Sequence, residues 1–153
     1  MKKVIFFIII LILLTSFANI YGVSFNDIKK DYYLEEALGV LSSYEVIQGY
    51  PDNSFRPDRI VTRAEMAKII TVAAGFNEFS KNMTTVYEDM HGHWAESYVE
   101  LAKGLGIVKG ISPTVYGPDN QIKFEEAYTM ILRLLGYTDE SLAGTWPSNY
   151  YKK

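Results

Sequence analysis

The sequence predicts an all-α protein made of tandem helix-loop-helix repeats. Apolar residues recur at helical spacing in four segments, glycines follow those segments, and the chain superposes on itself at a fixed offset. A shift of 61 residues places Gly49 on Gly110, Glu65 on Glu126 and Gly75 on Gly136. A period of this size indicates stacked supersecondary units that cannot each bury a core alone.

The first eighteen residues have the features of an export signal. Lys2 and Lys3 precede an unbroken apolar run over residues 4–14, and Ser16 and Ala18 supply the small residues of a cleavage site. We therefore assign residues 1–18 to a signal peptide cleaved after Ala18, with Gly22 as the alternative cleavage point. An uncleaved membrane anchor is the other interpretation, although the run is shorter than the roughly 20 residues of a spanning helix.

Composition and charge narrow the classes of function. The 153 residues are 48% hydrophobic and 22% charged, so the chain can form a packed core. Without residues 1–18, 13 basic side chains face 18 acidic ones, a formal net charge of −5. This charge disfavours nucleic acid and requires any acidic ligand to be held by individually placed cations. The absence of cysteine excludes disulfides, thiolate metal sites and a cysteine nucleophile.

The helical segments form two matched pairs. The expected apolar faces of the first helices are Leu34, Ala37, Leu38 and Leu41, and Trp94, Tyr98, Leu101, Ala102 and Leu105. The expected faces of the second helices are Met66, Ile69, Ile70, Ala73 and Ala74, and Ala127, Met130, Ile131, Leu134 and Leu135. Gly75 and Gly136 are expected to cap the second helices, and Gly49 and Gly110 are suited to positive φ.

The loop between the first two helices carries a turn and a helix start. Residues 50–54 predict a β-turn in which Pro51 presets the first central angle. Thr62 and Glu65 have the spacing of a capping box at the start of the second helix. Capping leaves Arg63 unexplained, because the helix dipole mildly disfavours a cation there. Arg63, with free amides expected beside it at the helix start, is therefore a candidate carboxylate ligand, and an ion pair with a neighbouring aspartate is the alternative.

Catalytic and metal-binding constellations are not found in the sequence. His91 and His93 lack a third histidine or a carboxylate cluster, which favours a solvated loop over a metal site. No serine with a plausible base, no phosphate-binding glycine loop and no paired carboxylates can be assembled. We therefore predict a protein that is not an enzyme and needs no cofactor.

The run from Gly49 to Ala67 resembles the signature of S-layer homology repeats, and the resemblance extends over about residues 24–137. It implies repeats at residues 24–76 and 77–137, with residues 138–153 opening a third, in an incomplete pseudo-threefold helical bundle. It also implies an anchor at the bacterial surface, in the cell wall or surface layer, whose grooves bind a pyruvylated secondary cell-wall polysaccharide attached to peptidoglycan. Arg63 would meet the pyruvate carboxylate. The other groove candidates are Asp27, Gly49 and Tyr50 from the first repeat, and Asp89, Trp94 and Gly110 from the second.

Departures from the family pattern qualify this assignment. Lys123 and Phe124 stand where the second repeat should carry its threonine and arginine, so a second groove of the same chemistry is not expected. Trp94 suits sugar stacking, but a core position is equally compatible with its place in the apolar pattern. The third repeat is only begun, which predicts either a truncated gene product or a dependence on another S-layer homology or surface-layer chain as partner. The alternative function is a scaffold that packs on a surface-layer subunit without binding glycan.

Overall fold

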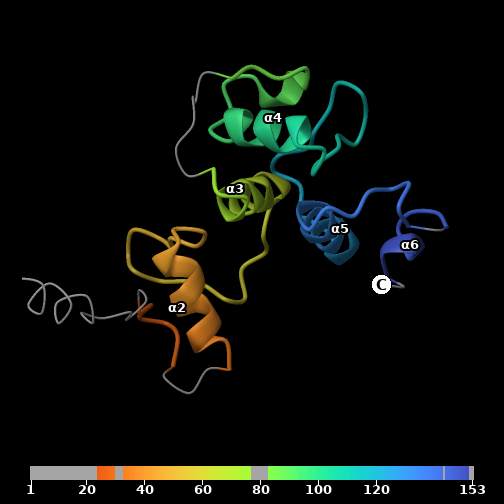
Figure 1. Ribbon diagram of the computed structural model, residues 1–153. Helices are drawn as coiled ribbons and strands as arrows, with labels where there is room; N and C mark the ends of the chain where they lie inside the picture. Colours follow the sequence, from red (N-terminus) through yellow and green to blue (C-terminus); the bar gives the residue numbers. More distant parts are fainter. Residues whose placement is uncertain (1–23, 30–32, 77–82, 143, 152–153) are drawn as a thin grey trace, which may run out of the picture. The chain divides into compact units, whose positions relative to one another are not determined.

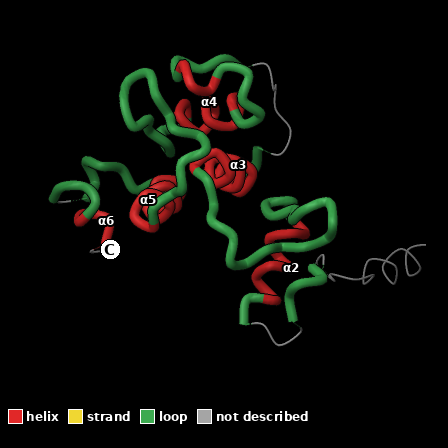
Figure 2. The backbone as a smooth tube through the Cα atoms, turned by 180° about the vertical axis from the view of Figure 1, so that it is seen from behind, coloured by secondary structure: helices red, strands yellow, loops and turns green. Residues whose placement is uncertain are grey.

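The computed structural model describes residues 24–29, 33–76, 83–142 and 144–151, and in them the chain is helical. The helices are α2 (Glu35–Ser43), α3 (Arg63–Ala73), α4 (Glu96–Gly104), α5 (Phe124–Leu134) and α6 (Ser148–Tyr151), with a 3₁₀ turn, η1, at Glu88–Met90 (Figure 1). These segments contain no strand, only an isolated bridge between Thr62 and Gln121 (Figure 2). The predicted all-α class is confirmed.

Two compact units divide the chain, residues 1–56 and residues 57–153, and each is described by itself. We call them the N-terminal and the C-terminal unit. The predicted pseudo-threefold arrangement therefore stays a prediction. The predicted signal peptide lies outside the described residues. Of the helices within those residues, none combines the length and hydropathy required to cross a membrane.

The N-terminal unit holds α2 and the loop that follows it. The Phe25 ring lies 5.4 Å from the Phe55 ring. The Asn53 amide donates to the Tyr50 carbonyl at 2.9 Å, which closes the predicted turn around Pro51. Among the four apolar residues expected to face the core from this helix, only Leu38 is buried.

The C-terminal unit is built around α3, which contacts both α4 and α5 (Figure 1). By sequence α3 is the second helix of the first repeat, yet its core partners come from the second. Small side chains on α3 and α4 let the helices approach closely. The buried core comprises Ala64, Ala67, Ile70, Tyr87, Met90, Ala95, Val99, Ala102, Ile107, Val108, Tyr116 and Met130.

The expected apolar face of α4 was only partly right. Ala102 is buried as expected, but the other buried apolar positions are Ala95 and Val99, whereas Trp94 and Leu105 are exposed. The reason is that α4 begins at Glu96, so Trp94 precedes the helix and does not follow its periodicity. A similar shift affects α5, in which Met130 is buried but Ile131 and Leu135 are exposed.

Helix ends agree more closely with prediction. The Thr62 hydroxyl accepts from the Glu65 amide at 3.2 Å, and the Glu65 carboxylate accepts from the Thr62 amide at 2.8 Å, so the capping box is confirmed. Gly75 and Gly136 both have φ of +89°, as expected of C-terminal glycine caps.

Candidate functional site

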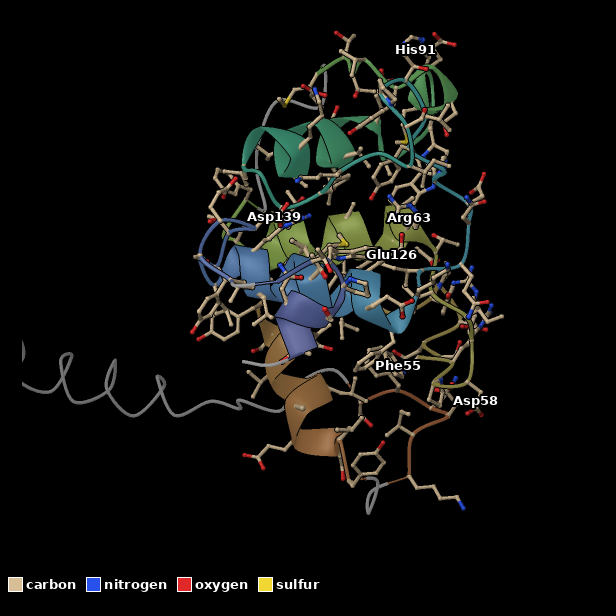
Figure 3. The ribbon with its side chains drawn as sticks, turned by 90° about the vertical axis from the view of Figure 1, so that its right-hand side faces the viewer. Phe55, Asp58, Arg63, His91, Glu126 and Asp139 are labelled. Carbon is tan, nitrogen blue, oxygen red and sulfur yellow. The ribbon has the colours of Figure 1, made fainter. Side chains whose placement is uncertain are left out.

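Arg63, the first residue of α3, is 6% exposed and makes three hydrogen bonds inside the C-terminal unit. Its Nε donates to the Tyr116 carbonyl at 3.0 Å and its Nη2 to the Lys109 carbonyl at 3.0 Å. Its Nη1 forms an ion pair with Glu126 of α5. Figure 3 shows Arg63 and Glu126 directed toward each other. The ion-pair alternative is thus present, but with a glutamate of the next repeat instead of a neighbouring aspartate.

Tyr116 lies under the Arg63 guanidinium and is fully buried. The guanidinium carbon is 4.6 Å from the centre of the Tyr116 ring, a cation–π distance. The Tyr116 hydroxyl donates to the Arg63 carbonyl at 3.1 Å. Burial raises the pKa of this hydroxyl to about 12, which keeps it a donor at any physiological pH.

The two carboxylate oxygens of Glu126 contact different partners. One carboxylate oxygen pairs with Arg63, and the other accepts from the Lys123 amide at 3.0 Å. The second bond is the glutamate half of a capping box. The other half is absent, since a lysine side chain has no acceptor for a backbone amide. This agrees with the predicted loss of the capping threonine.

The expectation of free amides at the start of α3 was wrong. The Arg63 amide donates to the Asn120 carbonyl at 2.9 Å and the Ala64 amide to the Pro118 carbonyl at 3.0 Å. The Glu65 amide is taken by the Thr62 hydroxyl. The loop of the second repeat runs alongside this helix start and uses its donors, so backbone amides do not supply an anion site there.

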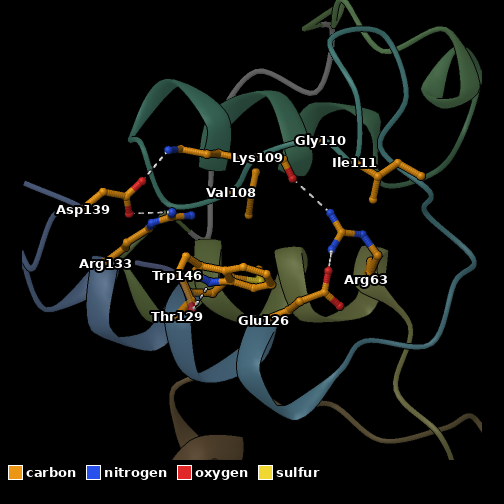
Figure 4. A pocket seen from close by; sticks show the side chains of 11 residues that line it. Arg63, Val108, Lys109, Gly110, Ile111, Glu126, Thr129, Arg133, Asp139 and Trp146 are labelled. Carbon is orange, nitrogen blue, oxygen red and sulfur yellow. Dashed lines mark hydrogen bonds and ion pairs between the residues drawn. The ribbon is translucent and has the colours of Figure 1, made fainter. Parts of the chain in front are cut away.

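A pocket of about 440 Å³ opens beside Arg63 (Figure 4). Trp146 borders it with an indole that is 50% exposed, held by a 3.0 Å hydrogen bond from its Nε1 to the Thr129 hydroxyl. Arg63 and Glu126 lie at one end, and the Lys109 ammonium, Arg133 and Asp139 lie at the other. The remaining lining residues are Val108, Gly110, Ile111 and Met130.

Asp27 and Asp89 have equivalent structural roles in their own units. Asp27 accepts from the amides of Phe55 and Arg56 at 2.8 and 2.7 Å. Asp89 accepts from the amides of Tyr116 and Gly117 at 2.8 and 2.6 Å. The amide of Phe55 is the main reason why the pKa of Asp27 lies below its usual value. Each aspartate thus fixes the loop that leads to the second helix of its repeat.

Gly49 and Gly110 are required for different reasons. Gly49 has φ of +68°, as predicted, and a Cβ there would also lie 2.3 Å from the Phe25 ring. Gly110 does not have positive φ, so that part of the prediction was wrong. Its requirement is space, because a Cβ would lie 2.5 Å from both the Ser112 carbonyl and the Tyr87 ring.

Two aromatic candidates lie outside the pocket lining. Trp94 is 56% exposed, which contradicts a core role and leaves its indole accessible. Tyr50 belongs to the N-terminal unit, where the Arg56 guanidinium carbon lies 4.0 Å from the centre of its ring. Of the seven predicted site residues, the pocket therefore brings together Arg63 and Gly110.

The histidines have local partners. His91 Nε2 lies 3.1 Å from the Thr85 carbonyl, and His93 Nδ1 accepts from the Ala95 amide at 3.2 Å. The described segments hold no group of three or more metal-ligating side chains.

Sequence reasoning missed Lys109, Arg133, Asp139 and Trp146 as site residues. Lys109 precedes a predicted groove residue, Gly110, which was the available signal. Trp146 lies in the predicted start of a third repeat, and nothing local indicates that it returns to α5. Arg133 lies among apolar residues in the last turn of α5, so the sequence pattern did not indicate a site residue there.

Comparison with known families gives a direct match. The model described as S-layer homology domain matches residues 24–67 and 86–127. A surface layer protein of Brevibacillus choshinensis is 35% identical over 82% of this chain and 11% of its own length. The middle cell wall protein of Brevibacillus brevis is 33% identical over 82% of the chain and 12% of its own length. The cellulosome-anchoring protein of Acetivibrio thermocellus is 31% identical over 74% of the chain and 26% of its own length.

The chain thus spans about a tenth to a quarter of the length of these relatives. The matched family and the relatives' names indicate a secreted protein of the bacterial cell wall or surface layer.

Proposed function

Because the chain belongs to the S-layer homology domain family, we propose that it attaches non-covalently to the cell wall by binding an acidic secondary cell-wall polysaccharide. The anchoring role is supported by the relative named as a cellulosome-anchoring protein. The pocket beside Arg63 is the proposed binding site. Its lining combines apolar surface, cations and a half-exposed indole, which is the composition expected of a site for a charged sugar.

Arg63 is proposed to contact the carboxylate of a pyruvylated sugar. Three of its five N–H groups are used by the Tyr116 and Lys109 carbonyls and by Glu126. The guanidinium also borders the pocket, and its two remaining N–H groups are the proposed donors to the ligand carboxylate. Its fixed orientation lowers the entropy cost of binding, because no flexible side chain has to be ordered.

The other predicted site residues are proposed to act around this centre. Asp89 and Gly110 shape the loop that borders the pocket, and Asp27, Gly49 and Tyr50 do the same for the equivalent loop of the first repeat. The exposed Trp94 is proposed to contact a further sugar outside the pocket.

Sedimentation with purified sacculi tests this function. The protein is expected to sediment with intact sacculi but not with sacculi stripped of their secondary polymer. Trp146→Ala is expected to weaken binding about fivefold or more, since truncating an aromatic anchor at a binding site typically costs more than about 1 kcal/mol. Phe124→Ala, an exposed aromatic on α5 away from the pocket, is the matched control. Equal binding to stripped walls would refute the proposal.

A scaffold function is the second candidate. The observation that favours it is the burial of Arg63 and its pairing with Glu126, which is what a purely structural arginine would show. A scaffold would sediment with assembled surface-layer protein and not with sacculi. Trp146→Ala, which changes a half-exposed residue of the pocket lining, separates the two. It should reduce glycan binding but leave assembly on a surface-layer subunit unchanged.

A further inference from the structure

The two ends of the pocket have different charge balances. At the Arg63 end one cation meets one acid, and the pair is largely removed from water, with side-chain exposures of 8% for Arg63 and 20% for Glu126. An anion approaching Arg63 therefore also approaches the Glu126 carboxylate. The net charge contributed to the pocket at this end is zero.

At the opposite end two cations share one acid. Arg133 Nη2 donates to Asp139 Oδ1 at 2.8 Å, and Lys109 Nζ donates to Asp139 Oδ2 at 2.5 Å. Arg133 also donates to the Ile107 carbonyl at 3.3 Å. Glu140, which follows Asp139, interacts with Lys109 electrostatically but is exposed and does not line the pocket. Water screens that charge more than those inside the pocket.

We propose that Lys109 and Arg133 form a second anion subsite, so that the glycan taken by this pocket carries two acidic groups, one toward each end. The proposal rests on the proposed function. The Arg133 guanidinium is held by Asp139 and the Ile107 carbonyl in a fixed position, which gives the subsite direction. The Lys109 ammonium, 66% exposed, can turn from Asp139 to an arriving anion at little cost, since exposed ion pairs are weak.

Trp146 lies between the two proposed anion subsites. Its indole lies between the Arg63 and Arg133 ends in Figure 4, fixed by the bond to Thr129. A sugar ring on the indole would direct one substituent toward Arg63 and the other toward Lys109 and Arg133. The second acidic group is a carboxylate or a phosphate, because both are bound by a guanidinium paired with an ammonium.

The test uses polymer released from sacculi and the chain with Lys109→Met. Because the Lys109 side chain is exposed, this change leaves the core intact, which a thermal melt checks. The variant is expected to bind the native polymer about fivefold more weakly, with less dependence on salt. The matched control is Lys103→Met, since Lys103 pairs with Glu100 on α4 and does not line the pocket.

Chemical treatment of the polymer identifies the second group. Mild acid removes pyruvate ketals, and the fivefold difference should persist on the treated polymer because it belongs to another acidic group. Hydrogen fluoride removes phosphate, and loss of the difference there would identify a phosphate, whereas persistence would identify a carboxylate. A difference that vanishes with the pyruvate would overturn the requirement for two acidic groups.

The remaining outcomes separate this inference from the proposed function. Should the wild-type chain bind the polymer while Lys109→Met binds it equally well, the subsite is refuted and the anchoring function stands. Failure of the wild-type chain to bind would refute both.

Discussion

Replacing Arg63 by methionine is expected to destabilise the C-terminal unit by about 3 kcal/mol. Removal of one partner from a buried ion pair costs about 3–5 kcal/mol, since the other charge is left without compensation. The lower end applies here because Glu126 keeps a 20% exposure and its bond from the Lys123 amide. The Tyr116 and Lys109 carbonyls also lose their donor. For a unit of this size the midpoint should fall by roughly 12–24 °C.

Thermal and urea unfolding of residues 19–153, followed by circular dichroism, measure this change. A double-mutant cycle with Glu126→Gln isolates the pair, and we expect a coupling of about 1–3 kcal/mol. Arg59→Met is the matched control, because Arg59 pairs with Glu65 at 2.5 Å but is exposed, so its loss should cost less than about 1 kcal/mol. If Arg63→Met unfolds at the same midpoint as Arg59→Met, the three acceptors around Arg63 do not stabilise the unit and the argument fails.

Three other changes have defined outcomes. Gly110→Ala should destabilise the C-terminal unit by about 1–3 kcal/mol through overpacking, whereas Gly104→Ala should stabilise it by about 0.5–1 kcal/mol, because Gly104 is helical and has open space around it. Equal midpoints of the two variants in thermal melts would refute the steric explanation. Thr62→Ala should lower the free energy of unfolding in urea by about 1 kcal/mol, and Lys123→Thr should raise it by about the same amount because the threonine completes a capping box. A Lys123→Thr variant with unchanged stability would count against this prediction. The hydrogen bond from the Ser54 hydroxyl is the main reason why the pKa of Asp52 is lowered to about 2, so the stability that Asp52 contributes is complete above its usual pKa of 3.8 and is lost as the pH falls toward 2. Asp52→Asn should therefore flatten the pH dependence of the free energy of unfolding in that window, and an unchanged slope would contradict this account.

Local features were predictable from the sequence because their causes lie within a few residues. The capping box of Thr62 and Glu65, the caps at Gly75 and Gly136 and the turn around Pro51 each depend on neighbours in the chain. The apolar face of α4 was misplaced because the pattern alone did not show that the helix begins at Glu96, after Trp94.

The site was less predictable because its contacts cross long stretches of chain. Arg63 was identified by exclusion, since capping did not account for it. Its acceptors at positions 109, 116 and 126 are at least 46 residues away, and no local signal links them to Arg63. The same holds for Trp146, which reaches Thr129 only through tertiary packing.

The position of α3 bears on how such repeats can be duplicated or exchanged. Copying one repeat by recombination carries an arginine at its second helix, but the acceptors that arginine needs are encoded in the repeat that follows. A newly inserted repeat is therefore expected to hold its arginine in the same way only if its downstream neighbour supplies these acceptors. The folded unit is then offset from the repeated segment, because the C-terminal unit begins at Pro57, inside the first repeat, and includes the whole of the second.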